Sequence, residues 1–409
     1  MSSGNLPRTA HPELFRWSDG LDPARYVVAR YVVTSCHDGE ATATAMAMEQ
    51  SAATTAIRGY VQPGMIEDWT IRVLAIDADP SPAESEVPVS HLATEVYPEG
   101  AQAPRSWSVT LAIPLVLLSG RPAQLLNVAI GELPRLGFLS RFRLDALELP
   151  GDFGPGPAFG IAGIRDRFGR PRGPLLCRSM RPAVGLDLAT MARLNRDVLV
   201  GGFHLVKDDE LQVFADDQAF RVHVKTMVEA RDAARQRTGE HKGYLANLIC
   251  EPDELQARWE IVNELGVDGV LVAPAIQGLG TLASLARQAR MPLLAHNTFS
   301  DLWNRHPGWG IAHDVLTGWM ERFGGDWHVT EGDRGRAGAE PAPPARGGPR
   351  QSMPILQGGK HPDGLADYRR ASGSDDYMLI VASWVDSHAD GLEQAARRFR
   401  EAIDEQIAV

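Results

Sequence analysis

Cysteine is scarce in this chain of 409 residues, which contains only Cys36, Cys177 and Cys250. Three cysteines cannot all pair within one chain, and none stands at the Cys-x-x-Cys spacing of a structural zinc site. This usage is typical of a reducing compartment, where disulfides are rare. We therefore expect a reduced, cytoplasmic protein without a structural zinc site.

Long hydrophobic runs are also missing. The longest, residues 111–118, is interrupted by Pro114, whereas a helix that spans a bilayer needs roughly 20 apolar residues. The N-terminal segment MSSGNLPRTAHPELF has no apolar core and is unlike a signal peptide. The sequence predicts no membrane association.

Positive charge is in deficit: 41 Lys and Arg residues stand against 52 Asp and Glu residues, so the formal net charge is −11. An acidic chain repels a phosphate backbone, which argues against nucleic acid as a partner. A local basic patch can still bind one small anion. The remaining composition, 44% hydrophobic and 23% charged, is that of a globular protein with room for two or three domains.

The N-terminal part of the chain mixes strand-like and helical patterns irregularly. Strands are expected at residues 26–33, 69–78, 107–118 and 136–149, and a helix at 40–53. The Gly- and Pro-rich stretch GDFGPGPAFG, residues 151–160, then marks a linker. We predict a small α+β N-terminal domain over residues 1–150 and a second domain over residues 151–409.

The second domain alternates short apolar runs with helical segments. Eight runs are strand-like: 175–180, 200–206, 244–250, 267–276, 292–297, 326–331, 353–359 and 377–384. The helical segments between and after them are 187–199, 216–238, 252–265, 281–290, 310–323, 362–371 and 389–407. This count and length fit a (β/α)8 TIM barrel, which typically has about 250 residues. A doubly wound open sheet is the alternative, because periodicity cannot detect closure.

One unit of the alternation is irregular. Residues 332–351 are rich in Gly, Pro and Arg, so a regular helix is not expected there. The segment is either a mobile surface loop or a functional lid.

Function in a barrel of this kind lies at the C-terminal ends of the strands. The second predicted strand ends in Lys207-Asp208-Asp209-Glu210, where three carboxylates follow one lysine. Clustered carboxylates repel one another unless a cation joins them, and oxygen donors of this kind suit Mg²⁺. The alternative is a solvated acidic turn at the N-terminus of the next helix.

The segment that contains this cluster, GGFHLVKDDE at residues 201–210, resembles the GGxDxxKDDE segment of the RuBisCO large-subunit superfamily. The resemblance extends over roughly residues 20–400. It includes GRP and GPLL at 169–176, RP and GL at 181–186, TGE and KG at 238–243, ELGV at 264–267 and GGD at 324–326. The superfamily combines an α+β, ferredoxin-like N-terminal domain with a C-terminal (β/α)8 barrel.

The resemblance implies a particular active site. It makes Lys207 a carbamylated lysine, formed with CO2, that binds Mg²⁺ together with Asp209 and Glu210. His296, at the end of the fifth strand, matches a family histidine and is a candidate general acid or base; a structural strand-end histidine is the alternative. Glu49 is expected to complete the site of a partner subunit in a homodimer or a multiple of dimers; a solvated helix-end carboxylate is the alternative there.

Departures from the family pattern concern the substrate. Arg181 stands where the family has a proton-handling lysine; arginine is a poor base but can hold an anionic oxygen. Asn297, Ser300 and Val329 stand where the family has phosphate-binding cations, although His328 is adjacent to Val329. Gly358 and Gly359 remain after strand seven, whereas Ala382 and Ser383 replace glycines after strand eight. The expected substrate-binding set is Arg181, His328, Gly358, Gly359, Lys360, Ser383 and Glu49.

These losses argue against carboxylation of ribulose bisphosphate. The sequence resembles a RuBisCO-like protein, a form IV relative whose known members share enolate chemistry. We expect an isomerase or lyase that uses Mg²⁺ to enolise a small anionic carbonyl or hydroxy compound derived from a sugar or sugar acid. Isomerisation, tautomerisation or decarboxylation would follow. The alternative is a catalytically silent relative with a binding or regulatory role.

Overall fold

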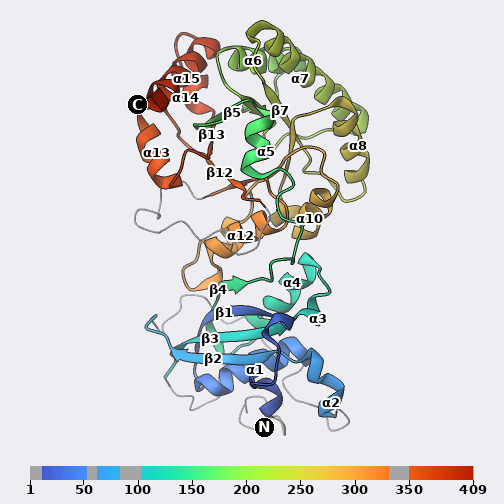
Figure 1. Cartoon of the computed structure of the whole chain (residues 1–409), viewed down its shortest axis with the longest axis vertical. Helices are drawn as coiled ribbons and strands as arrows, with labels where there is room; N and C mark the ends of the chain where they lie inside the picture. Colours follow the sequence, from blue (N-terminus) through green and yellow to red (C-terminus); the bar gives the residue numbers. More distant parts are fainter. Residues whose placement is uncertain (1–11, 53–61, 83–102, 331–349, 409) are drawn as a thin grey trace. The chain divides into compact units, whose positions relative to one another are not determined.

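The computed structural model describes residues 12–52, 62–82, 103–330 and 350–408 (Figure 1). The chain divides into two compact units. The first comprises Met1–Gly154 and Phe299–Gly318, and the second comprises Pro155–Thr298 and Trp319–Val409. The irregular segment 332–351 lies almost wholly outside the described residues.

The first unit is an α+β domain built on a five-stranded sheet in the order β10-β4-β1-β3-β2. The strands are β1 (Tyr26–Ser35), β2 (Arg72–Ala78), β3 (Arg105–Pro114), β4 (Leu139–Glu148) and β10 (Trp309–Ile311). The helices are α1 (Gly39–Ala52), α2 (Pro63–Ile66), α3 (Leu115–Leu118), α4 (Pro122–Ala129) and α11 (Asp301–Asn304). Strand β1 pairs antiparallel with both β3 and β4, and the Tyr31 hydroxyl donates to the Ala129 carbonyl at 2.7 Å, which ties the sheet to α4.

One part of this unit comes from far along the chain. Strand β10 pairs parallel with β4, and its Trp309 ring lies 6.2 Å from the Phe142 ring. Sequence analysis placed residues 299–318 in the second domain. A strand of three residues is too short to show periodicity, so its recruitment to the N-terminal sheet was not predicted.

The second unit contains a closed barrel of eight parallel strands in the order β11-β12-β13-β5-β6-β7-β8-β9. The strands are β5 (Leu175–Ser179), β6 (Leu205–Lys207), β7 (Gly243–Asn247), β8 (Gly269–Val272), β9 (Leu293–Ala295), β11 (Trp327–Val329), β12 (Met353–Leu356) and β13 (Met378–Val381). Each falls inside, or within one residue of, a run predicted from the sequence. Closure confirms the TIM barrel over the open sheet.

Helices follow the strands around the outside of the barrel (Figure 1). The long ones are α6 (Leu188–Val200), α7 (Asp217–Thr238), α8 (Leu255–Leu265), α10 (Leu279–Arg287), α13 (Leu365–Ser372) and α15 (Leu392–Ala408). Helix α5 (Gly160–Arg167) precedes the first strand, α12 is His313–Arg322, and α9 (Pro274–Gln277) and α14 (Ser383–Asp386) are single turns. Among the described residues, no helix is long and apolar enough to cross a membrane.

Strand alternation decides which side chains reach the barrel interior. Leu175, Leu205 and Leu245 belong to the buried core, with residues of the other strands. Lys207 stands two positions after Leu205 and therefore points inward at the C-terminal end of β6. The strand parity of residues 203, 205 and 207 would predict that Phe203 shares this face, but Phe203 precedes β6, and its ring lies edge-on to Phe399 of α15 at 6.0 Å.

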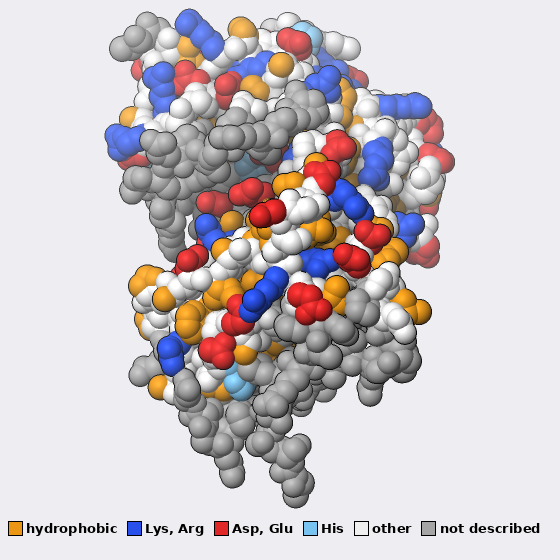
Figure 2. All heavy atoms as spheres, turned by 60° about the horizontal axis from the view of Figure 1, so that its bottom comes forward, with side chains coloured by type: hydrophobic (Ala, Val, Ile, Leu, Met, Phe, Trp, Pro, Cys, Tyr) orange, Lys and Arg blue, Asp and Glu red, His pale blue; other side chains and the backbone are white. Residues whose placement is uncertain are grey.

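The surface carries charges of both signs. Figure 2 shows Lys and Arg side chains interspersed with Asp and Glu side chains over the face in view. A mixed surface of this kind is typical of a protein that stays dispersed in water.

Candidate active site

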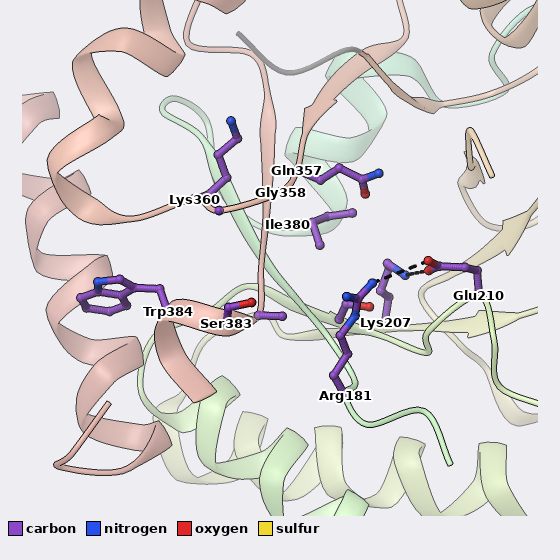
Figure 3. A pocket seen from close by; sticks show the side chains of 12 residues that line it. Arg181, Lys207, Glu210, Gln357, Gly358, Lys360, Ile380, Ser383 and Trp384 are labelled. Carbon is purple, nitrogen blue, oxygen red and sulfur yellow. Dashed lines mark hydrogen bonds and ion pairs between the residues drawn. The ribbon is translucent and has the colours of Figure 1, made fainter. Parts of the chain in front are cut away.

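A cavity opens at the C-terminal ends of four neighbouring strands, β12, β13, β5 and β6 (Figure 3). It is lined by Ser179, Arg181, Lys207, Glu210, Gln357, Gly358, Gly359, Lys360, Ile380, Ala382, Ser383 and Trp384. Seven of these residues were predicted from the sequence to act in catalysis, metal binding or substrate binding: Arg181, Lys207, Glu210, Gly358, Gly359, Lys360 and Ser383. Closure of the barrel brings them together, because β13 and β5, the last and the first strands of the barrel in the sequence, pair side by side.

Lys207 lies at the floor of the cavity with 1% of its surface exposed. Its Nζ donates to the Asp208 carbonyl at 3.0 Å and lies 3.3 Å from Glu210 Oε2. The loss of hydration on burying an amine has to be offset by such partners. The ion pair also acts on its acceptor: burial raises the pKa of Glu210, but the charges of Lys207 and His296 outweigh it and leave that pKa lowered.

Asp208 points away from the cavity and has a structural role. Its carboxylate accepts hydrogen bonds from the Tyr244 hydroxyl at 2.7 Å and the Asn247 amide N–H at 3.1 Å, and lies 2.9 Å from His223 Nε2. Burial by itself would lower the pKa of His223. The charge of Asp208 and this hydrogen bond outweigh burial, so the pKa of His223 is raised. The first aspartate of the cluster therefore joins β6 to β7 and α7. Of the two later acids, Glu210 lines the cavity, and Asp209 pairs with Arg181, which lines it as well.

Asp209 and Glu210 share a cation. Arg181 Nε donates to Asp209 Oδ2 at 2.9 Å, and Arg181 Nη2 lies 3.6 Å from Glu210 Oε1. Ser179 Oγ donates to the same Asp209 oxygen at 3.2 Å. The Asn247 side-chain amide donates to the carbonyls of Asp209 and Glu210, which fixes the backbone of the loop.

His296 faces the same carboxylates from β9, with its Nε2 3.6 Å from Glu210 Oε2. Burial first, and then the positive charge of Lys207, lower the pKa of His296 to about 4. The ring is therefore neutral near pH 7. Its Nδ1 accepts the Thr298 amide N–H at 3.1 Å, which places the ring proton on Nε2, the nitrogen that faces Glu210.

The opposite wall of the cavity is mainly backbone. Gly358 and Gly359 have φ of 79° and 61°, and a Cβ at either position would meet nothing within 4 Å. Lys360 is buried, and its Nζ lies 4.4 Å from the centre of the Tyr368 ring. Ser383 begins α14. Open backbone beside a lysine can take an anion.

Two predicted site residues lie elsewhere. His328 alternates with Trp327 and Val329, which face the barrel core, and so it points outward; its Nδ1 lies 2.8 Å from Ser352 Oγ. It does not line this cavity. Glu49 is half-buried in the last turn of α1, in the first unit, and its role in a partner's site stays a prediction.

Sequence reasoning missed three features that shape the cavity. Gln357 lines it, and its Nε2 donates to Asn297 Oδ1 at 3.2 Å. Trp384 also lines it, with its ring edge-on to Phe399. Arg178, 1% exposed, makes two hydrogen bonds to Asp386 Oδ1 and one to the Arg181 carbonyl at 3.3 Å. Strand alternation places Arg178 outside the barrel core. A charged residue within a strand that is otherwise apolar was the signal in the sequence that could have identified it.

The residues present fit a divalent cation. Within the described residues, no three His, Cys, Asp or Glu side chains are grouped as a metal site, but Glu210 lies beside the buried Lys207 amine, and Arg181 bridges Glu210 to Asp209. A carbamate on that amine would add the third oxygen donor. Three anionic oxygen ligands are the donor set that Mg²⁺ prefers.

The fold and the site define a class: a (β/α)8 barrel with an α+β unit, and a Lys-Asp-Asp-Glu cluster at the barrel mouth. Residues 160–339 match the family model of the ribulose bisphosphate carboxylase large chain, catalytic domain. The chain is 27% identical to an uncharacterised ribulose bisphosphate carboxylase-like protein of Bordetella bronchiseptica over 93% of this chain and 92% of that protein. It is 30% identical to the 2,3-diketo-5-methylthiopentyl-1-phosphate enolase of Geobacillus thermodenitrificans over 73% of this chain and 75% of that protein.

Solved structures agree on the fold. A dimeric archaeal Rubisco from Hyperthermus butylicus superposes with a TM-score of 0.83 at 23% identity, over 97% of this chain and 94% of that one. A rubisco-like protein from Alicyclobacillus acidocaldarius gives 0.79 at 25% identity, over 95% of each chain. The chain belongs to the RuBisCO large-chain family and is a RuBisCO-like protein.

Proposed function

We propose that this protein is a Mg²⁺-dependent enzyme that enolises a small anionic carbonyl compound and lacks ribulose bisphosphate carboxylase activity. The observation that carries the proposal is the cluster at the end of β6, where Glu210 lies 3.3 Å from Lys207 and 3.6 Å from His296 and is bridged to Asp209 by Arg181. Relatives named as enolases of a diketo phosphate support chemistry of this type.

Lys207, Asp209 and Glu210 would hold the metal. The deprotonated Lys207 amine adds to CO2 and loses a proton, which gives a carbamate and converts a cation into an anionic ligand. Bound there, Mg²⁺ supplies Lewis-acid polarisation of a substrate carbonyl. The Asp208 hydrogen bonds and the Asn247 amide hold the backbone that presents these ligands.

His296 acts as a proton donor in this scheme. Its neutral ring carries the proton on Nε2, at the edge that faces the carboxylates. A neutral imidazole N–H can donate to an oxygen that becomes negative during enolisation, and burial prevents the ring from becoming fully charged beforehand. Arg181 supplies a guanidinium that can hold an anionic oxygen, because arginine is a poor base.

The substrate's anionic group lies between Arg181 and the Gly358–Lys360 segment. Both contribute to the same cavity, and each offers donors that suit a carboxylate or a single phosphate. Gln357, which also lines the cavity, and its hydrogen-bond partner Asn297 present neutral amides. We propose a sugar-derived substrate with one anionic group, which is isomerised, tautomerised or decarboxylated after enolisation.

Oligomerisation as a dimer or a multiple of dimers completes the proposal. Four apolar side chains are more than half exposed in the segments that follow β5, β6 and β8: Val184, Leu211, Val213 and, in α9, Ile276. Exposed apolar residues gathered at one end of a barrel are typical of an interface. A monomer in sedimentation-velocity ultracentrifugation at micromolar concentration would contradict it.

Direct metal titration tests the main proposal. Calorimetry with Mg²⁺ and bicarbonate should show one site per chain, and ¹³C NMR with labelled bicarbonate should show a carbamate signal that Lys207→Met removes. Absence of Mg²⁺ binding would favour the catalytically silent alternative. The ion pairs of Arg181 with Asp209 and Glu210 are compatible with that alternative, because they neutralise both candidate ligands without a metal. Fixation of labelled CO2 onto ribulose bisphosphate would refute the absence of carboxylase activity.

A further inference from the structure

Arg181 combines a fixed backbone with an exposed side chain. Its carbonyl accepts a hydrogen bond from Arg178, which is itself 1% exposed and paired with Asp386. Its own side chain is 57% exposed. A guanidinium on a long flexible stem can therefore move while the chain that carries it stays in place.

The Arg181 guanidinium forms ion pairs with the two carboxylates that would hold a metal. It contacts Asp209 at 2.9 Å and Glu210 at 3.6 Å. With Lys207, the four groups form a neutral set of two cations and two anions. If Lys207 becomes a carbamate and a divalent cation binds, the set of three anions, Arg181 and the metal is neutral again. Metal and guanidinium nevertheless compete for the same oxygens, and like charges repel at this range.

We propose that Arg181 is a positioning residue with two places: it neutralises Asp209 and Glu210 without metal, and it is displaced into the cavity on metal binding, where it binds the substrate's anionic group. This inference rests on the proposed function, whose metal site it uses. The cavity provides the second place, since Arg181 lines it together with Gly358, Gly359 and Lys360 (Figure 3).

Displacement makes metal and anion binding cooperative. While Arg181 is paired with Asp209 and Glu210, it cannot bind the substrate's anionic group. Once Arg181 binds that anionic group, it no longer competes with the metal for the two carboxylates. Linkage then requires that each ligand tighten the other by the same factor, on the order of tenfold for coupled sites. The site would thus admit substrate mainly after it is loaded with metal.

Calorimetry on the full chain tests this with Mg²⁺ as the metal and sulfate as the anion, in constant bicarbonate. For the wild type, Mg²⁺ affinity should rise about tenfold with saturating sulfate, and sulfate affinity should rise equally with Mg²⁺. Arg181→Met should bind Mg²⁺ more tightly than wild type without sulfate, and its Mg²⁺ affinity should not respond to sulfate. Arg181→Lys should retain part of the coupling, because it keeps a cation without the bidentate fork.

The control is Arg221→Met, which removes an exposed arginine paired with Glu264 on the outside of the barrel and should change neither affinity. If Arg181→Met binds Mg²⁺ no more tightly than wild type, or keeps the coupling, the inference is overturned while the metal site stands. If the wild type binds no Mg²⁺, the inference and the proposed function both fall. Circular dichroism spectra check that each variant is folded.

Discussion

The two ends of the cavity are built in different ways. At the carboxylate end, Lys207, Asp209 and Glu210 are linked to one another, to Arg181 and to His296 by ion pairs and hydrogen bonds. At the glycine end, Gly358 and Gly359 present open backbone, with no heavy atom within 4 Å of an added Cβ. One end is held by many mutually dependent contacts and the other by few.

This difference predicts which parts of the site tolerate substitution. A buried charge that loses one partner costs several kcal/mol, so a connected cluster tolerates little change. An open backbone wall can accept a change of side chain nearby at smaller cost. We infer that the carboxylate end determines the chemistry and that the glycine end, with Arg181, determines the substrate.

The largest effect is expected at Asp208, which supports the carboxylate end from behind. Asp208→Ala leaves the Tyr244 hydroxyl, the Asn247 N–H and His223 without their acceptor. Because breaking a buried pair in this way costs about 3–5 kcal/mol, the free energy of unfolding should fall by that amount. Urea denaturation measures it. Asp390→Ala, which removes a half-exposed partner of Arg398, should cost at most about 1 kcal/mol. Equal effects at the two positions would contradict the comparison.

Lys207→Met tests the chemistry of the same end. It removes the carbamate ligand, so Mg²⁺ affinity in bicarbonate should fall by more than about a hundredfold, the upper range for groups that only support a metal ligand. The control Lys225→Met removes an exposed lysine on α7 and should leave affinity unchanged. The proposed ligand set is wrong if Lys207→Met binds Mg²⁺ as well as the wild type.

Gly359→Ala tests the glycine end. The added methyl group meets no neighbour, so its cost is the strain of a left-handed backbone, about 1–2 kcal/mol. Sulfate affinity should also fall, whereas Mg²⁺ affinity without sulfate should not change. Gly280→Ala, in α10 with ordinary φ and open space, should be neutral or stabilising by up to about 1 kcal/mol. A Gly359→Ala variant as stable as Gly280→Ala would show that the positive φ carries no cost.

The smallest effect is expected at His204, in the barrel wall away from the candidate site. Burial, and then the charge of Arg400, lower the pKa of His204 well below its usual value, and its Nδ1 accepts the Leu176 N–H. In the unfolded chain His204 is protonated below about pH 6.5, whereas in the folded chain it stays neutral. The free energy of unfolding therefore falls as the pH drops below about 6.5. Between pH 7 and pH 5, His204→Gln should lose less unfolding free energy than the wild type. An identical pH slope in both proteins would rule His204 out as the cause.

Local pattern was enough to predict the secondary structure of the barrel. All eight strands fall at predicted runs, and the Lys-Asp-Asp-Glu cluster lies at a strand end as expected. Alternation also places Lys207 inward through Leu205, and it would have placed His328 outward, beside the inward Trp327. These are consequences of a two-residue side-chain period, which any strand imposes on its neighbours in the sequence.

Contacts between distant residues were decided only by the tertiary structure. Periodicity carries no information on which strands pair, so neither barrel closure through β13 and β5 nor the pairing of β10 with β4 could be derived from it. The same holds for the two aspartates, identical in type and adjacent in sequence: Asp208 binds Tyr244 and His223, whereas Asp209 binds Arg181. The sequence by itself determined which groups are present and which face of a strand they occupy. Folding decided their partners, because charge and hydrogen bonding act through distances in space that the chain's order does not contain.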